Sequence, residues 1–88
     1  MLALEMEGHY VRAHTAAGST LILMRMRDAV AELDGIDGMQ VHRSWWVARS
    51  AVENAAQHGR SITLRLKGGI KAPVARNSVP ALRAAGWL

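Results

Sequence analysis

The four histidines have the widest chemical range of any side chains in this sequence, because imidazole can bind a metal or transfer a proton near neutral pH. They are His9, His14, His42 and His58, and the chain contains no cysteine. His9 and His14 are five residues apart on a predicted strand and would point to opposite faces, and no Asp or Glu follows at ligand spacing. We therefore expect no metal site and no bound cofactor.

Nucleophilic or acid–base catalysis has equally little support in the sequence. Ser44 lies two residues from His42, but a local pair without an acid to orient the histidine is weak evidence for a nucleophile. The seven carboxylates are scattered over predicted turns and one helix face, and no pair lies inside an apolar run that would raise a pKa. The glycines follow no phosphate-loop spacing. The sequence predicts that the protein is not an enzyme.

The basic side chains are the most informative group, because they are distributed unevenly along the chain. Residues 1–53 contain five basic side chains and all seven acids, whereas residues 54–88 contain six basic side chains and no acid. Nine of the eleven basic residues are Arg, whose planar guanidinium suits phosphates and guanine edges. With a pI near 10.7, this asymmetry predicts an anionic partner such as nucleic acid.

The elements that must position these side chains begin with three strands. Apolar and polar residues alternate over residues 2–7 and 9–15 with a turn at Gly8, and an apolar run over residues 20–24 follows a glycine turn in residues 16–19. From Met26 the period becomes helical, and the pattern ends at Gly35 and Gly38. One short amphipathic helix should therefore follow the first three strands.

The rest of the chain again favours extended structure. Residues 39–42 and 45–49 are predicted as strands interrupted at Arg43 and Ser44, and residues 51–57 are predicted as extended although their composition has helical propensity. Residues 62–67 and 70–74 form a second predicted hairpin with one cationic face, and Pro73 predicts an edge strand or its end. A short helix from Ser78 should stop near Gly86.

Length and composition bound the class of protein. Eighty-eight residues fit one domain, 1–88, and the pattern of elements predicts a β-dominated α+β fold. No apolar stretch approaches the roughly 18 residues of a spanning helix, and no signal peptide opens the chain, so we expect no membrane contact from this segment. The absence of cysteine fits a reducing compartment, and the expected location is the cytoplasm.

Three segments carry a resemblance to a known family. Residues 39–47 (MQVHRSWWV) look like the central signature of the LytTR DNA-binding domain, an R-x-H-R-S-[FYW]-x-V type run. Residues 4–15 resemble the family's first two strands and glycine turn, and residues 64–77 resemble its closing hairpin and the segment before the last helix. The resemblance covers essentially the whole chain, with the segments in the family's order.

The resemblance implies the output module of a bacterial transcription regulator, such as the response regulator of a two-component system. Its fold would be elongated and mostly antiparallel, and its loops would enter successive major grooves of duplex DNA without a recognition helix. A homodimer on direct repeats, with some bending of the DNA, and a receiver domain or signalling partner outside these residues are further implications. The operator, the regulated genes and the input signal do not follow from it.

Matched position by position, the resemblance implies a set of DNA contacts. The base-reading residues would be His9, Arg43, Arg76 and Asn77. The phosphate-binding residues would be His42, Ser44, Arg49 and Lys71. The chain departs from the family where Ala48 and Arg49 follow the signature valine instead of Asn, and where Ala75 replaces the usual Ser. These changes remove polar groups that could bind phosphates, while Arg49 adds a charge.

Two other readings of the sequence remain open. In the first, the basic second hairpin of a protein-interaction module docks an acidic partner. In the second, the domain binds RNA or single-stranded nucleic acid, which would need aromatic side chains exposed on the sheet. Trp45 and Trp46 are the candidates, although neighbouring strand residues face opposite sides and at least one indole should lie in the core. A structural role is the favoured interpretation for both indoles.

Overall fold

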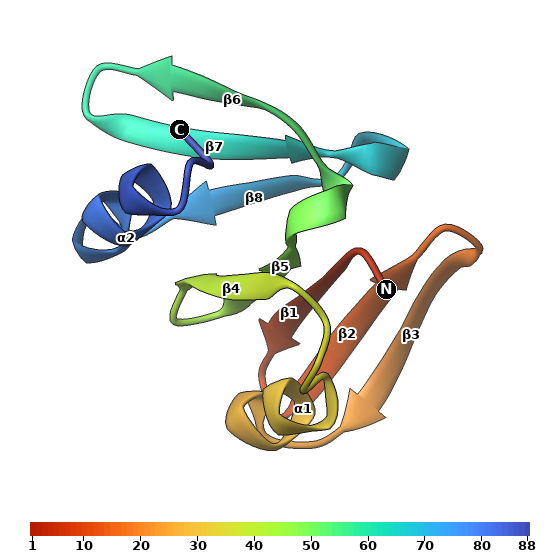
Figure 1. Ribbon diagram of the computed structural model, residues 1–88. Coiled ribbons are helices and arrows are strands. Elements are labelled where there is room, and N and C mark those ends of the chain that lie inside the picture. Colours follow the sequence, from red (N-terminus) through yellow and green to blue (C-terminus); the bar gives the residue numbers. More distant parts are fainter.

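The computed structural model describes residues 1–88 and contains two antiparallel sheets and two short α-helices (Figure 1). A five-stranded sheet, ordered β3-β2-β1-β5-β4, comprises β1 (Ala3–Glu7), β2 (Tyr10–Thr15), β3 (Gly18–Leu23), β4 (Gly38–His42) and β5 (Trp45–Ala48). A three-stranded sheet, ordered β6-β7-β8, comprises β6 (Val52–His58), β7 (Ser61–Leu66) and β8 (Lys71–Val74). The helices are α1 (Met26–Glu32) and α2 (Val79–Ala84), and the single-turn 3₁₀ helices are η1 (Arg49–Ala51), η2 (Lys67–Gly69) and η3 (Arg76–Ser78).

The predicted fold class is confirmed. The molecule is β-dominated, both sheets are antiparallel, α1 follows the first three strands, and α2 lies near the C-terminus. Its extents of 34 × 26 × 24 Å make it moderately elongated, with the sheets at opposite ends of the molecule (Figure 1). The extended prediction for residues 51–57 is also confirmed by β6, an edge strand of mostly exposed polar and small residues.

One hydrophobic core joins the two sheets. Its 17 buried residues include Leu4 and Val11 from the first sheet, Leu64 and Leu66 from β7, and Leu82 from α2. On β7, buried Ile62, Leu64 and Leu66 alternate with more exposed residues, as predicted for a strand with one covered face. This shared core ties the positions of loops from both sheets to one another.

Both neighbouring tryptophans are buried, in agreement with the structural roles that the sequence favoured for both. Trp45 is 8% exposed and Trp46 is 3% exposed, because both faces of β5 are covered. On one face, the Trp45 ring stacks on His14 with centroids 5.8 Å apart. On the other, Trp46 lies against Gly38, where a Cβ would overlap the indole ring. The exposed sheet aromatics that a single-strand binder needs are therefore not supplied by these tryptophans.

The third strand begins earlier than the sequence predicted, and none of its residues is buried. It begins at Gly18 instead of Thr20, because Thr15 closes a tight turn in which its Oγ1 accepts from the Ala17 N–H and donates to the Gly18 carbonyl. All six residues of β3 are exposed, including Leu23 at 71%. This apolar run therefore forms an exposed edge strand without charged residues.

Candidate nucleic-acid interface

Three connecting loops meet at one end of the molecule, and backbone hydrogen bonds hold them there. β1 and β5 are antiparallel, so the β1–β2 turn lies beside the β4–β5 turn, and the Met6 N–H donates to the Ser44 carbonyl at 2.8 Å. The Ala75 N–H donates to the Val41 carbonyl at 2.8 Å, which places the loop after β8 beside β4. The structure thus gathers the three segments that were predicted to carry base-reading residues.

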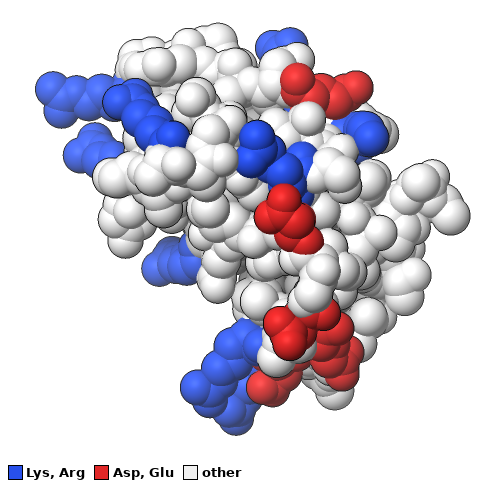
Figure 2. All heavy atoms as spheres, in the orientation of Figure 1, with Lys and Arg blue, Asp and Glu red and all other residues white.

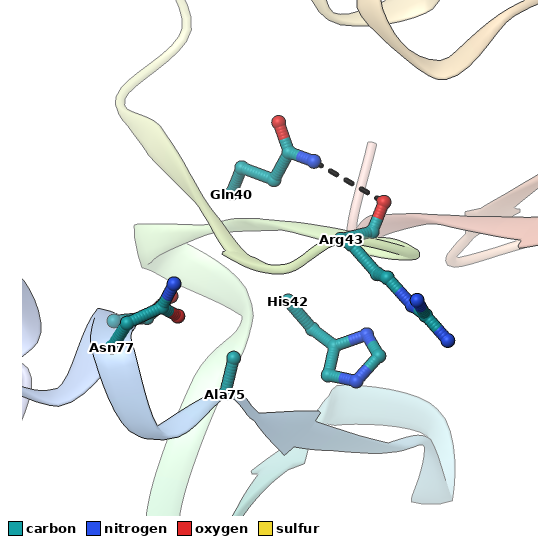
Figure 3. A pocket seen from close by; sticks show the side chains of 6 residues that line it. Gln40, His42, Arg43, Ala75 and Asn77 are labelled. Carbon is teal, nitrogen blue, oxygen red and sulfur yellow. Dashed lines mark hydrogen bonds between the residues drawn. The ribbon is translucent and has the colours of Figure 1, made fainter.

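The β4–β5 turn is shaped by its own side chains. A β-bulge between Gln40 and His42 changes the register before the turn. The His42 Nδ1 accepts a hydrogen bond from the Ser44 N–H at 3.1 Å, which leaves the proton of the neutral ring on Nε2. The Gln40 Nε2 donates to the Arg43 carbonyl at 3.3 Å (Figure 3). These bonds order the backbone that carries the exposed Arg43 side chain.

A cleft of about 440 Å³ separates this turn from η3. In Figure 3, His42 and Asn77 come from facing segments, and the Arg43 side chain extends outward from the turn. The lining residues are Gln40, His42, Arg43, Ala75, Asn77 and Ser78. The structure therefore brings Arg43, His42 and Asn77 together at one cleft, with Gln40 and Ser78 as further neighbours. Their DNA contacts stay predictions. Gln40 lies only two residues before His42, and this closeness in sequence could have indicated it as a neighbour.

Arg76 lies next to Asn77 in the chain but lines a different cavity. That cavity, of about 410 Å³, is shared with Arg60 and Arg83 and does not include Arg43. Sequence reasoning did not single out Arg60 or Arg83. Arg60 lies 16 residues from Arg76 along the chain, and the folded sheet brings it there. Arg83 lies on α2, seven residues after Arg76, a spacing of about two helical turns that could have indicated it.

His9 occupies the tip of the β1–β2 turn and is exposed. Gly8 precedes it with a φ of +61°, a left-handed conformation that favours glycine, and this forms the tight connection between Glu7 and Tyr10. His9 makes no side-chain hydrogen bond within the chain, so its ring is free to contact a partner. Its strands place it at the same end of the sheet as Arg43.

Lys71 lies away from the three loops. It begins β8, four residues before Ala75, which corresponds to about 13 Å of extended strand. It pairs in register with Arg65 and lines a separate cavity that also includes Glu53. A phosphate contact from Lys71 stays a prediction, and it would require DNA that extends beyond the loops along this sheet.

Arg49 has a structural role that the sequence did not indicate. Its guanidinium donates to the carbonyls of Ala85 at 3.0 Å and Gly86 at 3.2 Å, and it lies 5.5 Å from the centre of the Trp87 ring. A cation that binds the free carbonyls after a helix stabilises the end of that helix. These contacts account for the position of Arg49, and its predicted phosphate contact stays a prediction.

The charges are distributed unevenly over the molecule. Figure 2 shows cationic side chains projecting on the side that carries α2 and the β6–β7 turn, and most of the visible acidic side chains on the half that carries α1, where cationic side chains also project beside them. The two ion pairs, Arg12–Glu7 at 2.6 Å and His14–Glu5 at 3.1 Å, both lie on the five-stranded sheet. The hydrogen bond from Arg12 lowers the pKa of Glu7 below its ordinary value, against the smaller opposing effect of desolvation. The basic side chains of residues 54–88 form no ion pair within the chain.

Two further findings concern metal ligands and membrane-spanning helices. No three His, Asp or Glu side chains come together in an arrangement that could hold a metal ion. No helix is long and apolar enough to cross a membrane.

Comparisons with known proteins show the family to which this fold belongs. Residues 1–87 match the family described as the LytTr DNA-binding domain. The chain is 31% identical over 85 residues to the CO-responsive transcriptional regulator RcoM of Rhodospirillum rubrum, which covers 94% of this chain and 36% of that regulator. The fold is similar to the solved LytTr DNA-binding domain of a Bacillus cereus protein described as a methyl-accepting/DNA response regulator, with a TM-score of 0.83 over 99% of this chain and 81% of that one, at 14% identity.

The fold and its loops define a small, β-rich DNA-binding module of transcription regulation. The chain belongs to the LytTR DNA-binding domain family. The resemblance predicted from the HRS turn and its flanking segments is confirmed, and the chain spans about a third of the length of RcoM.

Proposed function

We propose that this domain binds double-stranded DNA in a sequence-specific manner and acts as the output domain of a bacterial transcription regulator. The observation that supports this most is the convergence of the β1–β2, β4–β5 and β8–η3 loops at one end, with exposed side chains that make no ion pair. Turns of this kind can enter a major groove, which is roughly 12 Å wide in B-DNA.

The proposed base contacts follow from the hydrogen-bonding groups at the loop tips. Arg43 and Arg76 can each donate two hydrogen bonds to O6 and N7 of guanine. Asn77 can pair with the N6 and N7 edge of adenine, and His9 can donate to or accept from a purine edge. Each good bidentate contact discriminates between bases by about 1–3 kcal/mol.

The proposed phosphate contacts lie behind these tips. With Nδ1 of His42 occupied by the Ser44 N–H, the Nε2–H is the free donor of that ring, and the Ser44 hydroxyl is its neighbour. Lys71 and Arg49 would extend the phosphate contacts toward the three-stranded sheet. Such contacts add affinity for every sequence and do not distinguish bases.

The assembly around this domain is also a proposal. We expect two copies to bind direct repeats, a receiver domain or another signalling partner to control them, and the regulator to work in the cytoplasm as part of a two-component system. RcoM is described as a CO-responsive regulator, and this chain matches about a third of it, so the signal that reaches this domain would come from elsewhere in its own regulator.

Selection of bound duplexes from a random pool tests the proposal and reports the binding motif directly. Titration of the selected duplex at several salt concentrations should give a linear fall of log affinity with log salt, with a slope of about −0.9 for each phosphate contact. A random duplex should bind more weakly and with a similar slope. Failure to enrich any duplex, or affinity without salt dependence, would contradict the proposal.

A second candidate is a protein-interaction module. Arg65, Lys67 and Lys71 are exposed at the end of the three-stranded sheet away from the loops, where they form a charged edge. This charged edge favours the second candidate. An acidic protein partner would bind this edge without base preference. The absence of an enriched motif, together with binding that is lost in Lys71→Ala and retained in Arg43→Ala, would favour this candidate over the first.

A further inference from the structure

Three arginines line the cavity on the side of η3 that does not face Arg43. Arg60 comes from the β6–β7 turn, Arg76 from η3 and Arg83 from α2, and the cavity measures about 410 Å³. The remaining lining residues are Gln57, Ile62, Val79 and Pro80. All three guanidiniums are exposed, and none makes a hydrogen bond or an ion pair within the chain.

This arrangement is unfavourable for the isolated chain. Three like charges around one cavity repel one another, and no acid occurs in residues 54–88 to offset them. The five-stranded sheet shows the usual alternative, since Arg12 there is bound by Glu7. The cavity therefore has the charge of a site for an anion that comes from outside the chain.

The chemistry of the three side chains narrows the class of anion. Guanidinium groups bind phosphate oxygens with paired, parallel N–H donors, and this geometry is the reason that Arg is common at phosphate sites. The cavity is open and shallow enough for its arginines to remain exposed, so it suits a group presented on an extended ligand. A phosphodiester of a nucleic acid backbone offers phosphate oxygens and is presented on an extended ligand.

The position of the cavity relates it to the proposed DNA interface. The η3 segment separates the two cavities, because Asn77 and Ser78 line the cleft with Arg43, whereas Arg76 lines the cavity with Arg60 and Arg83. A loop that enters the major groove has a phosphate strand on each side of it. The cavity lies where one of those strands would pass when η3 reads bases.

We infer that Arg60 and Arg83 bind a backbone phosphate of the DNA strand that flanks the η3 loop, with Arg76 between that phosphate and the bases. This inference rests on the proposed function and assigns Arg60 and Arg83 to it. The two arginines supply affinity without base preference, whereas Arg43 and Asn77 supply the preference.

The test compares two double variants that remove the same charge. Arg60→Gln/Arg83→Gln removes the cavity's outer cations, and Arg65→Gln/Lys67→Gln removes two exposed cations at the opposite end of β7. Affinities of the wild type and both variants are measured for the selected duplex and a random duplex over a range of salt. Because all four side chains are exposed, both variants should keep the wild-type melting temperature.

We expect Arg60→Gln/Arg83→Gln to lower the affinity of the protein for both duplexes by the same factor, at least about tenfold, because charged hydrogen bonds to a phosphate are lost. The salt slope should become shallower by about 1, since both side chains face one phosphate. Arg65→Gln/Lys67→Gln should change the affinity and the salt slope by less. Arg60→Lys/Arg83→Lys should recover part of the affinity, because the charge returns without the paired donors.

Several outcomes would overturn the inference. It is wrong if wild-type protein binds the selected duplex and Arg60→Gln/Arg83→Gln binds it equally well, or if the two double variants lose affinity equally. If the wild type binds no duplex, the proposed function fails and this inference fails with it. Saturable binding of inorganic phosphate to the cavity, measured by amide shifts of Arg60 and Arg83, together with unchanged duplex affinity of the double variant, would identify a free-phosphate site instead.

Discussion

The two sheets differ in how they satisfy their charges. The five-stranded sheet holds both ion pairs of the chain, the Trp45–His14 stack and the Trp46–Gly38 contact. The three-stranded sheet and α2 carry cations that no acid of the chain binds. Internal ion pairs thus hold Arg12 and His14 in the first region, whereas the cations of the second region have no acidic partner within the chain. In our account the first sheet contributes the base-reading turns of His9 and Arg43, and the second contributes most of the affinity for the backbone.

This comparison requires that the two regions fold as one unit, and Trp46→Ala tests that most strongly. Removing a buried tryptophan should destabilise the domain by about 3–5 kcal/mol, which approaches the whole stability of a chain of this size. Because the core is continuous, hydrogen exchange should accelerate at Leu64 on β7 as well as at Leu4 on β1. Trp46→Phe should keep the fold with a smaller loss. Acceleration confined to the first sheet would show that the regions are independent.

Gly38→Ala should produce the next largest effect on stability. A Cβ at this position overlaps the Trp46 ring, and overpacking of this kind costs about 1–3 kcal/mol. Urea unfolding measures the change. The variant that combines Gly38→Ala with Trp46→Leu is the control, because a smaller side chain makes room for the methyl group and the two effects should then not add. Additive losses would mean that the glycine has another role.

Arg43→Ala tests the division between base reading and backbone binding. We expect a loss of about 1–3 kcal/mol for the selected duplex and a much smaller loss for a random duplex, because one base contact disappears. Lys71→Ala should lower the affinity for both duplexes by the same factor, and this loss should be smaller than the loss that Arg43→Ala causes for the selected duplex. Competition binding with the two duplexes provides the measurement. A uniform loss in Arg43→Ala would remove the distinction between the two regions.

Arg49→Ala should lower the free energy of unfolding by about 1 kcal/mol, because the carbonyls of Ala85 and Gly86 lose a charged donor. Thermal unfolding measures the loss, and Arg49→Lys should recover only part of it, since Lys lacks the planar fork that reaches both carbonyls. If Arg49 also binds a phosphate, duplex affinity will fall by the same factor for every sequence. Unchanged stability would contradict the capping role.

The smallest effect concerns the exposed Arg12–Glu7 pair. Arg12 lowers the pKa of Glu7 in the folded state, so the stabilisation from this pair is present above the ordinary pKa and is lost as the pH falls through the lowered one. In Arg12→Gln, the midpoint of the Glu7 carboxyl titration, followed by NMR, should rise toward the ordinary value. The same midpoint in both proteins would show that the pair does not form in solution.

The sequence predicted the regular parts of this structure because they have a clear period. Alternation identified β7 and β8, Pro73 indicated that β8 is an edge strand, and the change of period at Met26 located α1. It favoured structural roles for both tryptophans, and both are buried. It did not indicate whether β3 is covered, because a period of two shows which residues share a face and not whether that face is buried.

The candidate site was predictable only where its residues are local in sequence. The HRS turn lies within one signature segment, so Arg43 and His42 could be assigned together. The meeting of Arg60 with Arg76 and Arg83 depends on the pairing of β6, β7 and β8, and the contacts of Arg49 join residues 36 and 37 positions apart. Such long-range contacts cannot be predicted from the spacing of residues in the sequence.

The most direct test of the account is a map of the backbone amides that shift when the selected duplex is added to labelled protein. We predict the largest changes at Gly8 and His9, at Arg43 and Ser44, and at Arg76 and Asn77, with little change along β3. Changes confined to the edge formed by Arg65, Lys67 and Lys71, with the three loops unaffected, would contradict it.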